Sequence, residues 1–301
     1  MDTLTELNSR FGSGRLLFEA GPAGLIRASL STNISEAELY LHGAHVTRFR
    51  KRDSPPVLFL SDKSCYAQRK AIRGGIPVVF PWFGAHPSDP TKPAHGFARI
   101  MTWSVVEAET SADRVQMTLR LAANDDTREL WPHEFVASLA VTLDDRLTVA
   151  LEVANISSES FEFEEALHSY ISVGDVRRAL VHGLEETAYI DKKDMKRKLH
   201  GPSPIVIEQE TDRVFLNTAA TCTISDPDLQ RSVVIDKSGS SSTIIWNPHS
   251  EKAKAMSDLG DDDWQQMICV ETGNVADNLI HLNGGERWLI SATIDSRPMG
   301  R

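Results

Sequence analysis

The chain has 301 residues, of which 41% are apolar and 25% charged, an ordinary globular balance with ample material for a core. Its 32 basic and 42 acidic residues leave a formal net charge of −10 at pH 7. Such an acidic balance argues against a nucleic-acid or anionic-membrane partner. A local cluster of arginines could still bind a small anion.

Cysteine usage and the N-terminal residues indicate the compartment. Three scattered cysteines (Cys65, Cys222 and Cys269) are too few for a disulfide framework or a zinc site. The N-terminus is acidic and polar where a secretory signal would have a basic start and an apolar run. No apolar stretch approaches the length of a transmembrane helix. We therefore expect a cytoplasmic protein, and a monomer is the default for a chain of this size.

Strand-like segments dominate the chain in its N- to C-terminal order. They are expected at 101–108, 114–121, 135–143, 146–154, 232–235, 243–246 and 288–294. In 146–154 the apolar side chains alternate, which places Leu147, Val149, Leu151 and Val153 on one face. Asp144 and Asp145 indicate a tight turn before it. Helical periodicity is scarce, and short helices are expected only near 64–70, 126–130 and 261–266.

This succession of short strands with Gly, Asn, Asp and Pro between them predicts antiparallel sheets packed face to face, not βαβ units. The predicted fold is all-β, a large antiparallel β-sandwich with a few short helices. No internal repeat, linker or break in composition divides the chain. One domain over residues 1–301 is the simplest interpretation, and a division into two halves has no linker to support it.

The segment AIRGGIPVVFPWFG (71–84) is the first that could carry chemistry. Arg73 precedes two glycines that let the backbone approach a ligand, and a strand is expected at 76–80. An arginine in apolar surroundings needs an anionic partner. Trp82 and Phe83 then place aromatic surface at a loop, where packing in the core is an equally good interpretation.

A second such segment, AHGFARIMTW (94–103), brings another arginine, Arg99, just before a strand. Two converging guanidinium groups would bind a phosphate or a carboxylate in a fork. The alternative for Arg99 is a salt bridge with an acidic neighbour. His95 could contact a ligand or simply be a loop residue bonded to the backbone.

His168, in EEALHSYISVGD, and Glu271, in MICVETGN, each follow a short apolar stretch typical of a buried strand. Alone, the histidine fits a structural residue and the glutamate a salt-bridge partner. Together in one cavity they could give one proton and take another. The sequence does not support a metal site, because His42 and His45 should point to opposite faces of a strand and no HxH pair is present. Nor is there a GxSxG, P-loop or dinucleotide-binding motif.

The segments IRGGIPVVFPWFG, HGFAR, ALHSYISVGD and WNPHSEKAKAMSDLGDDDWQQMICVETGN occur in this order. Over residues 40–295 this arrangement resembles the aldose 1-epimerase superfamily, in its hexose-6-phosphate mutarotase (glucose-6-phosphate 1-epimerase) branch. The resemblance implies the galactose-mutarotase-like supersandwich. It also implies a catalytic role for His168 and Glu271, with Arg73, Arg99 and Asp212 as substrate contacts. Ala94 departs from relatives that have a polar residue there, and Trp82 and Phe83 would form the floor of the sugar site.

The activity implied by the resemblance needs no metal and no organic cofactor. Glu271 would take the proton of the anomeric hydroxyl while a protonated His168 donates to the ring oxygen, and a nearby carboxylate such as Glu271 or Glu165 should favour the imidazolium. Two other functions stay open, namely mutarotation of an unphosphorylated sugar such as galactose and non-catalytic binding or sensing of a sugar phosphate. Glycoside hydrolysis would need two acids in the cleft, and the candidates pair an acid with a histidine instead.

Overall fold

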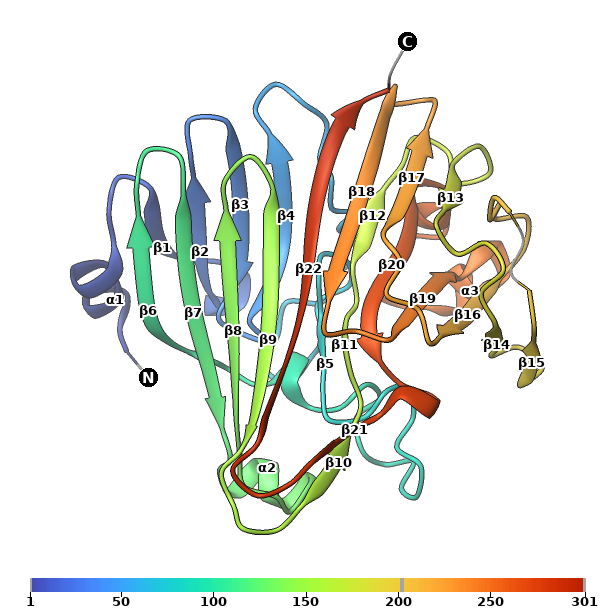
Figure 1. Cartoon of the computed structure of the whole chain (residues 1–301). Helices are drawn as coiled ribbons and strands as arrows, with labels where there is room; N and C mark the ends of the chain where they lie inside the picture. The colour runs from blue at the N-terminus through green and yellow to red at the C-terminus, as the bar shows by residue number, and fades with distance from the viewer. Residues whose placement is uncertain (1, 201–202, 300–301) are drawn as a thin grey trace.

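The computed structural model describes residues 2–200 and 203–299, so residues 1, 201–202 and 300–301 of the predicted domain lie outside the description. The fold is a large antiparallel β-sandwich with three short α-helices in the described part (Figure 1). The all-β sandwich predicted from the sequence is confirmed. One hydrophobic core cluster extends from Leu7 to Ile294.

A broad eight-stranded sheet forms one layer, in the order β13-β17-β18-β22-β9-β8-β7-β6. Its strands are β6 (Ser104–Thr110), β7 (Val115–Ala122), β8 (Phe135–Leu143), β9 (Leu147–Asn155), β13 (Leu180–His182), β17 (Cys222–Asp226), β18 (Arg231–Ser238) and β22 (Arg287–Pro298). Buried and partly exposed residues alternate without a break along β8 and β9, as the sequence pattern predicted. One face of the sheet therefore packs into the core.

A second eight-stranded sheet, which we call the site sheet, has the order β15-β14-β16-β19-β20-β11-β5, and β12 also pairs with β20. Its strands are β5 (Val78–Val79), β11 (Glu165–Leu167), β12 (Tyr170–Ser172), β14 (Tyr189–Asp191), β15 (Lys196–Lys198), β16 (Thr211–Leu216), β19 (Ser242–Asn247) and β20 (Met267–Asn274). Every residue of β19 and β20 is buried. These two central strands are therefore covered on both faces.

The remaining strands complete the sandwich. A four-stranded sheet contains β1 (Leu16–Ala20), β2 (Ile26–Ser31), β3 (Ser35–Tyr40) and β4 (His45–Lys51). A small antiparallel pair joins β10 (Phe161–Phe163) to β21 (Ile280–Leu282), from a distant part of the chain. Because β3 contacts β8 and β20 contacts β22, the four-stranded sheet and the site sheet pack against different halves of the broad sheet (Figure 1).

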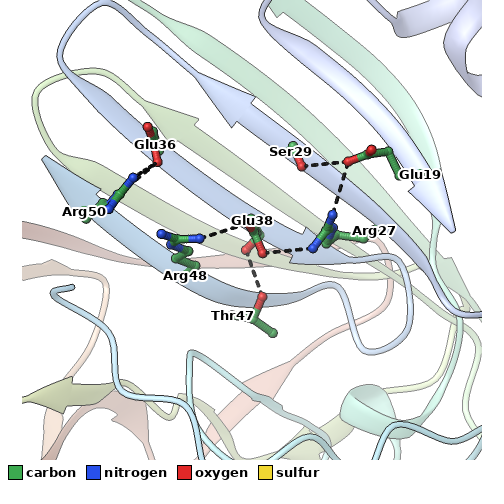
Figure 2. Close-up of polar contacts among 8 residues, drawn as sticks. All are labelled: Glu19, Arg27, Ser29, Glu36, Glu38, Thr47, Arg48 and Arg50. Carbon is green, nitrogen blue, oxygen red and sulfur yellow. Dashed lines mark hydrogen bonds and ion pairs between the residues drawn. The ribbon is translucent and has the colours of Figure 1, made fainter. Parts of the chain in front are cut away.

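Cross-strand ion pairs cover the four-stranded sheet on its other face (Figure 2). They link Arg27 to Glu19 and Glu38, Arg48 to Glu38, and Arg50 to Glu36. Opposite charges on neighbouring strands are the favourable arrangement on a solvated sheet face. This face therefore points to solvent, and the apolar face of the sheet points to the core.

The short helices agree only in part with the sequence-based expectations. The α-helices are α1 (Leu4–Phe11), α2 (Asp125–Leu130) and α3 (His249–Ala255), and the 3₁₀ helices are η1 (Pro22–Gly24), η2 (Ala98–Ile100), η3 (Asp263–Gln266) and η4 (Ala276–Asn278). The helix expected near 126–130 is confirmed as α2, and the one near 261–266 is the 3₁₀ helix η3. No helix in residues 2–200 or 203–299 is long and apolar enough to cross a membrane.

Three expectations about local structure were wrong. Residues 64–70 form turns and irregular backbone, because the Ser64 hydroxyl bonds to the backbone of Arg73 and ties the segment to the site loop. The strand expected at 76–80 is only β5, with isolated bridges at Ile76 and Phe80. Glu271 lies inside β20, whereas we expected it beyond a strand end.

Candidate active site

A cavity of about 340 Å³ opens over the site sheet and collects six of the seven residues predicted for the site. Its lining contains Arg73, His95, Arg99, His168, Asp212 and Glu271. The volume falls within the usual range for small-molecule sites. The sequence positions of these residues span most of the chain, so only the folded sheet brings them together.

Strand pairing places His168 opposite Glu271. Leu167 at the end of β11 pairs with Thr272, and Tyr170 at the start of β12 pairs with Cys269. The two residues between β11 and β12 leave the regular ladder, and the His168 N–H instead donates to Pro77 O at 3.1 Å. The imidazole therefore turns toward β20, and its Nε2 lies 3.4 Å from Glu271 Oε1.

The His168 ring is held by aromatic packing. It stacks on Tyr170 with ring centroids 4.7 Å apart and an interplanar angle of 10°, and the Trp246 ring meets it edge-on at 6.0 Å. His95 approaches from another side, with ring centroids 5.7 Å apart. Among the described residues, His168 Nδ1 and Glu271 Oε2 have no hydrogen-bond partner. The pair is thus fixed in position and retains unused polar capacity.

The two arginines differ in how far their charge is already matched. Arg73 donates from Nη1 to the Tyr170 hydroxyl and from Nη2 to Asp258 Oδ2, each at 2.9 Å. Arg99 donates from Nη2 to the carbonyl of Ala94 at 2.8 Å and forms no ion pair with a described carboxylate. Burial, followed by the charge of Arg73, lowers the pKa of Arg99 to about 10. Of the two arginines, Arg99 is therefore the one whose charge has no described carboxylate beside it.

Glycines let the two arginine-bearing segments approach the sheets closely. Gly75 has a φ of +62°, and a Cβ there would collide with the backbone of Val46. Gly96 has a φ of +71°, and a Cβ there would collide with the carbonyl of Phe80. Both positions favour glycine in conformation and in space. The closeness lets RGG and HGFAR form one wall of the cavity.

Burial governs the protonation of the central pair. It raises the pKa of the Glu271 carboxyl well above its usual range, with Asp212 adding to the rise and Arg99 opposing it. It lowers the pKa of His168 well below its usual range, with His95, Arg99 and Arg73 acting in the same direction. Both shifts therefore favour a neutral carboxylic acid and a neutral imidazole over the charged pair. We had expected an imidazolium, but desolvation and guanidinium charges outweigh the attraction of the carboxylate.

Asp212, on β16, faces the cavity from the same side of the site sheet as Glu271. It pairs with Trp246 on β19, which in turn pairs with Cys269 on β20, so Asp212 shares a face with Cys269 and Glu271. Burial raises the pKa of Asp212, and the charges of Lys252 and Lys192 lower it. Both lysines line the cavity as well. Neither lysine was predicted as a site residue from the sequence.

Trp82 is the predicted site residue that does not line the cavity. Its indole is buried, donates from Nε1 to Pro93 O at 2.9 Å, and packs edge-on against Phe97. The packing interpretation of this tryptophan therefore holds. The aromatic lining comes from Phe83, which was expected, and from Tyr170 and Trp246, which were not.

His42 and His45 are buried, and each is bonded to a backbone carbonyl. His42 Nε2 lies 2.7 Å from Lys70 O, and His45 Nε2 lies 2.7 Å from Gly74 O. Burial lowers the pKa of His45 to about 3, so this ring stays neutral. The two histidines support the loop that carries Arg73.

Comparison with known proteins shows the family of this chain. Residues 27–294 match the aldose 1-epimerase family. A Cenchrus ciliaris protein is 35% identical over 262 residues, 84% of this chain and 78% of its own. An Escherichia coli K12 protein is 33% identical over 238 residues, 79% of each chain. Both are named "putative glucose-6-phosphate 1-epimerase".

Solved structures give the same result. The crystal structure of YeaD from Salmonella typhimurium, described as a "putative mutarotase", has a TM-score of 0.89 and 28% identity, covering 95% of both chains. A galactose mutarotase-like protein of Clostridium acetobutylicum shares the fold with a TM-score of 0.75 over 94% of this chain and 98% of that one, at 16% identity. The fold is that of these mutarotase-like proteins. The chain belongs to the aldose 1-epimerase family and is an isomerase.

Proposed function

We propose that this enzyme interconverts the α and β anomers of a hexose 6-phosphate, with glucose 6-phosphate as the favoured substrate. The observation that carries the proposal is the pairing of His168 and Glu271 at 3.4 Å in a cavity that also holds Arg99, a guanidinium without a carboxylate partner. The names of the relatives favour the same substrate. Mutarotation of unphosphorylated sugars is the second candidate, and it would leave Arg99 unmatched.

The reaction needs one base and one acid acting together. In the proposed mechanism Glu271 takes the proton of the anomeric hydroxyl as His168 Nε2 gives a proton to the ring oxygen. The bond between C1 and the ring oxygen breaks, and the free aldehyde forms. Rotation about the C1–C2 bond presents the other face of the aldehyde. The two residues then exchange roles, the ring closes, and both recover their starting protonation.

Substrate binding itself would set the protonation that this mechanism needs. In the free protein both pKa shifts favour a proton on Glu271 over one on His168, because burial and the two guanidinium groups disfavour a charged imidazole. A phosphate bound at Arg73 and Arg99 would offset those positive charges and add negative charge nearby. The proton would then move across the 3.4 Å between the side chains to His168. An unphosphorylated sugar brings no such charge.

The test is NMR or polarimetry of freshly dissolved α-glucose 6-phosphate with and without protein. We expect the wild-type protein to accelerate mutarotation and Glu271→Gln to lose about 10²-fold to 10⁴-fold of that rate with its fold intact. Glu165→Gln is the matched control, since Glu165 is a buried carboxyl on β11 that does not line the cavity.

Two results would overturn the proposal. Wild-type protein that leaves the mutarotation rate of glucose 6-phosphate unchanged would act on an unphosphorylated sugar, or bind a sugar phosphate without turning it over. Full activity in Glu271→Gln would remove the base from the mechanism.

A further inference from the structure

The cavity contains a lysine that none of the preceding chemistry uses. Lys192 directly follows β14 and lines the cavity. Its backbone N–H donates to Asp212 O at 2.8 Å, so the pairing of β14 with β16 sets the two residues beside each other. The charge of Lys192 lowers the pKa of both Asp212 and His95, which places its ammonium within electrostatic reach of both side chains.

The charged groups of Lys192 and Asp212 have no ion-pair or hydrogen-bond partner among the described residues, unlike those of their neighbours. Lys252 is paired with Glu210 at 2.8 Å, and Lys198 is paired with Asp191 at 2.7 Å. Lys192 forms no ion pair with a described carboxylate, and the Asp212 carboxylate accepts no hydrogen bond from a described residue. One cationic donor and one anionic acceptor therefore face the same cavity without contacting each other.

The order of the strands arranges the polar groups in a sequence that matches a pyranose ring. Lys192 and Asp212 belong to the β14–β16 side, and Glu271 lies on β20. His168 follows β11, and Arg73 lies on the segment that leads into β5. In a hexose 6-phosphate the order around the ring is C3, C2, O1, the ring oxygen and the phosphate on C6. With Glu271 at O1, His168 at the ring oxygen and the phosphate at Arg73, the C2–C3 edge faces Asp212 and Lys192.

We propose that Lys192 is a specificity-determining residue that, together with Asp212, binds a hydroxyl on the C2–C3 edge of the hexose. This inference rests on the proposed function. A hydroxyl both donates and accepts, so it can donate to the Asp212 carboxylate while it accepts from the Lys192 ammonium. An epimer or a deoxy sugar at that carbon leaves both charged groups without their partner, and a site of this kind rejects such analogues strongly.

The test compares Lys192→Met with Lys193→Met. Lys193 is exposed on the same hairpin and does not line the cavity, so its replacement makes the same change of charge without touching the substrate. The kcat/KM for mutarotation is measured with glucose 6-phosphate and with its 2-deoxy, 3-deoxy and 4-deoxy analogues.

With glucose 6-phosphate we expect Lys192→Met to lose about tenfold or more in kcat/KM, mainly through KM, the usual effect of removing a hydrogen bond to a charged group. Lys193→Met should match the wild type. In the wild type, loss of the 2-hydroxyl or the 3-hydroxyl should cost a similar factor. That cost should largely disappear in Lys192→Met, while the cost of losing the 4-hydroxyl stays the same in both proteins.

Other outcomes overturn the inference and leave the proposed function standing. If Lys192→Met behaves like Lys193→Met, the lysine does not touch the sugar. If the variant loses the same factor on every phosphorylated analogue and none on free glucose, Lys192 binds the phosphate instead. An inactive wild-type protein is a different result, because it refutes the proposed function itself.

Discussion

Replacing Arg99 with methionine should make the protein more stable and weaken its binding of phosphate. The Arg99 guanidinium donates to Ala94 O, has no carboxylate partner among the described residues and leaves Nε without an acceptor. Its pKa falls from 12.5 to about 10 because of burial and the charge of Arg73. At about 1.4 kcal/mol per pKa unit, the charged form costs at most about 3 kcal/mol at neutral pH.

Part of that cost is offset by the hydrogen bond to Ala94, which contributes about 1–2 kcal/mol. Methionine fills a similar volume without a charge. Arg99→Met should therefore raise the free energy of unfolding by about 1–2 kcal/mol in the absence of anions, as measured by urea unfolding. Adding inorganic phosphate should stabilise the wild type by RT ln(1 + [L]/Kd) and should stabilise the variant much less.

Arg69→Met is the matched control, because Arg69 is exposed and pairs with Asp126 away from the cavity. It should change the free energy of unfolding by less than about 1 kcal/mol and leave the effect of phosphate intact. The reasoning is refuted if Arg99→Met unfolds at clearly lower urea than the wild type. It is also refuted if phosphate stabilises Arg99→Met and the wild type equally, or stabilises neither.

Two further predictions concern buried or paired carboxyl groups. Burial raises the pKa of Glu165 from 4.5 to about 8, so its contribution to stability is fully present below pH 4.5 and is lost as the pH rises through about 8. At about 1.4 kcal/mol per pKa unit, the wild type loses on the order of 5 kcal/mol of stability. Glu165→Gln should therefore unfold at a higher urea concentration than the wild type at alkaline pH, and the difference should shrink toward pH 4.5. A difference that stays constant with pH would contradict the raised pKa of Glu165. Asp258→Asn removes the carboxylate that neutralises Arg73. Inorganic phosphate should therefore bind a few-fold more tightly to the variant in calorimetric titrations. Weaker binding would show instead that Asp258 holds Arg73 in its binding position.

The parts of the fold that could be predicted from the sequence are those with a local cause. Alternation in β8 and β9 follows from one buried face, and each strand carries that pattern by itself. The helix α1 was missed although Thr3 and Glu6 form a capping box, a signal that the sequence contains. The helix α3 lacks a side-chain cap, and the sequence offered no comparable signal for it.

The residues of the candidate site also divide into those with a signal in the sequence and those without one. Arg73 and Arg99 could be proposed because charge beside glycine in apolar segments is unusual, and His168 and Glu271 because of the family resemblance. Lys192 was overlooked because it lies in the charged run DKKDMKRK, where a single lysine does not stand out. Trp82 was misplaced because an aromatic residue in a loop has the same local pattern whether it faces a cavity or the core.

The sequence by itself determined the residue types, the strand periodicity and the glycines that permit close approach. Tertiary structure alone decided which of these residues meet. The 3.4 Å between His168 and Glu271 results from the interruption between β11 and β12 and from their pairing with β20. Tertiary structure also decided the direction of both pKa shifts, because desolvation depends on everything packed around a group and not on its neighbours along the chain.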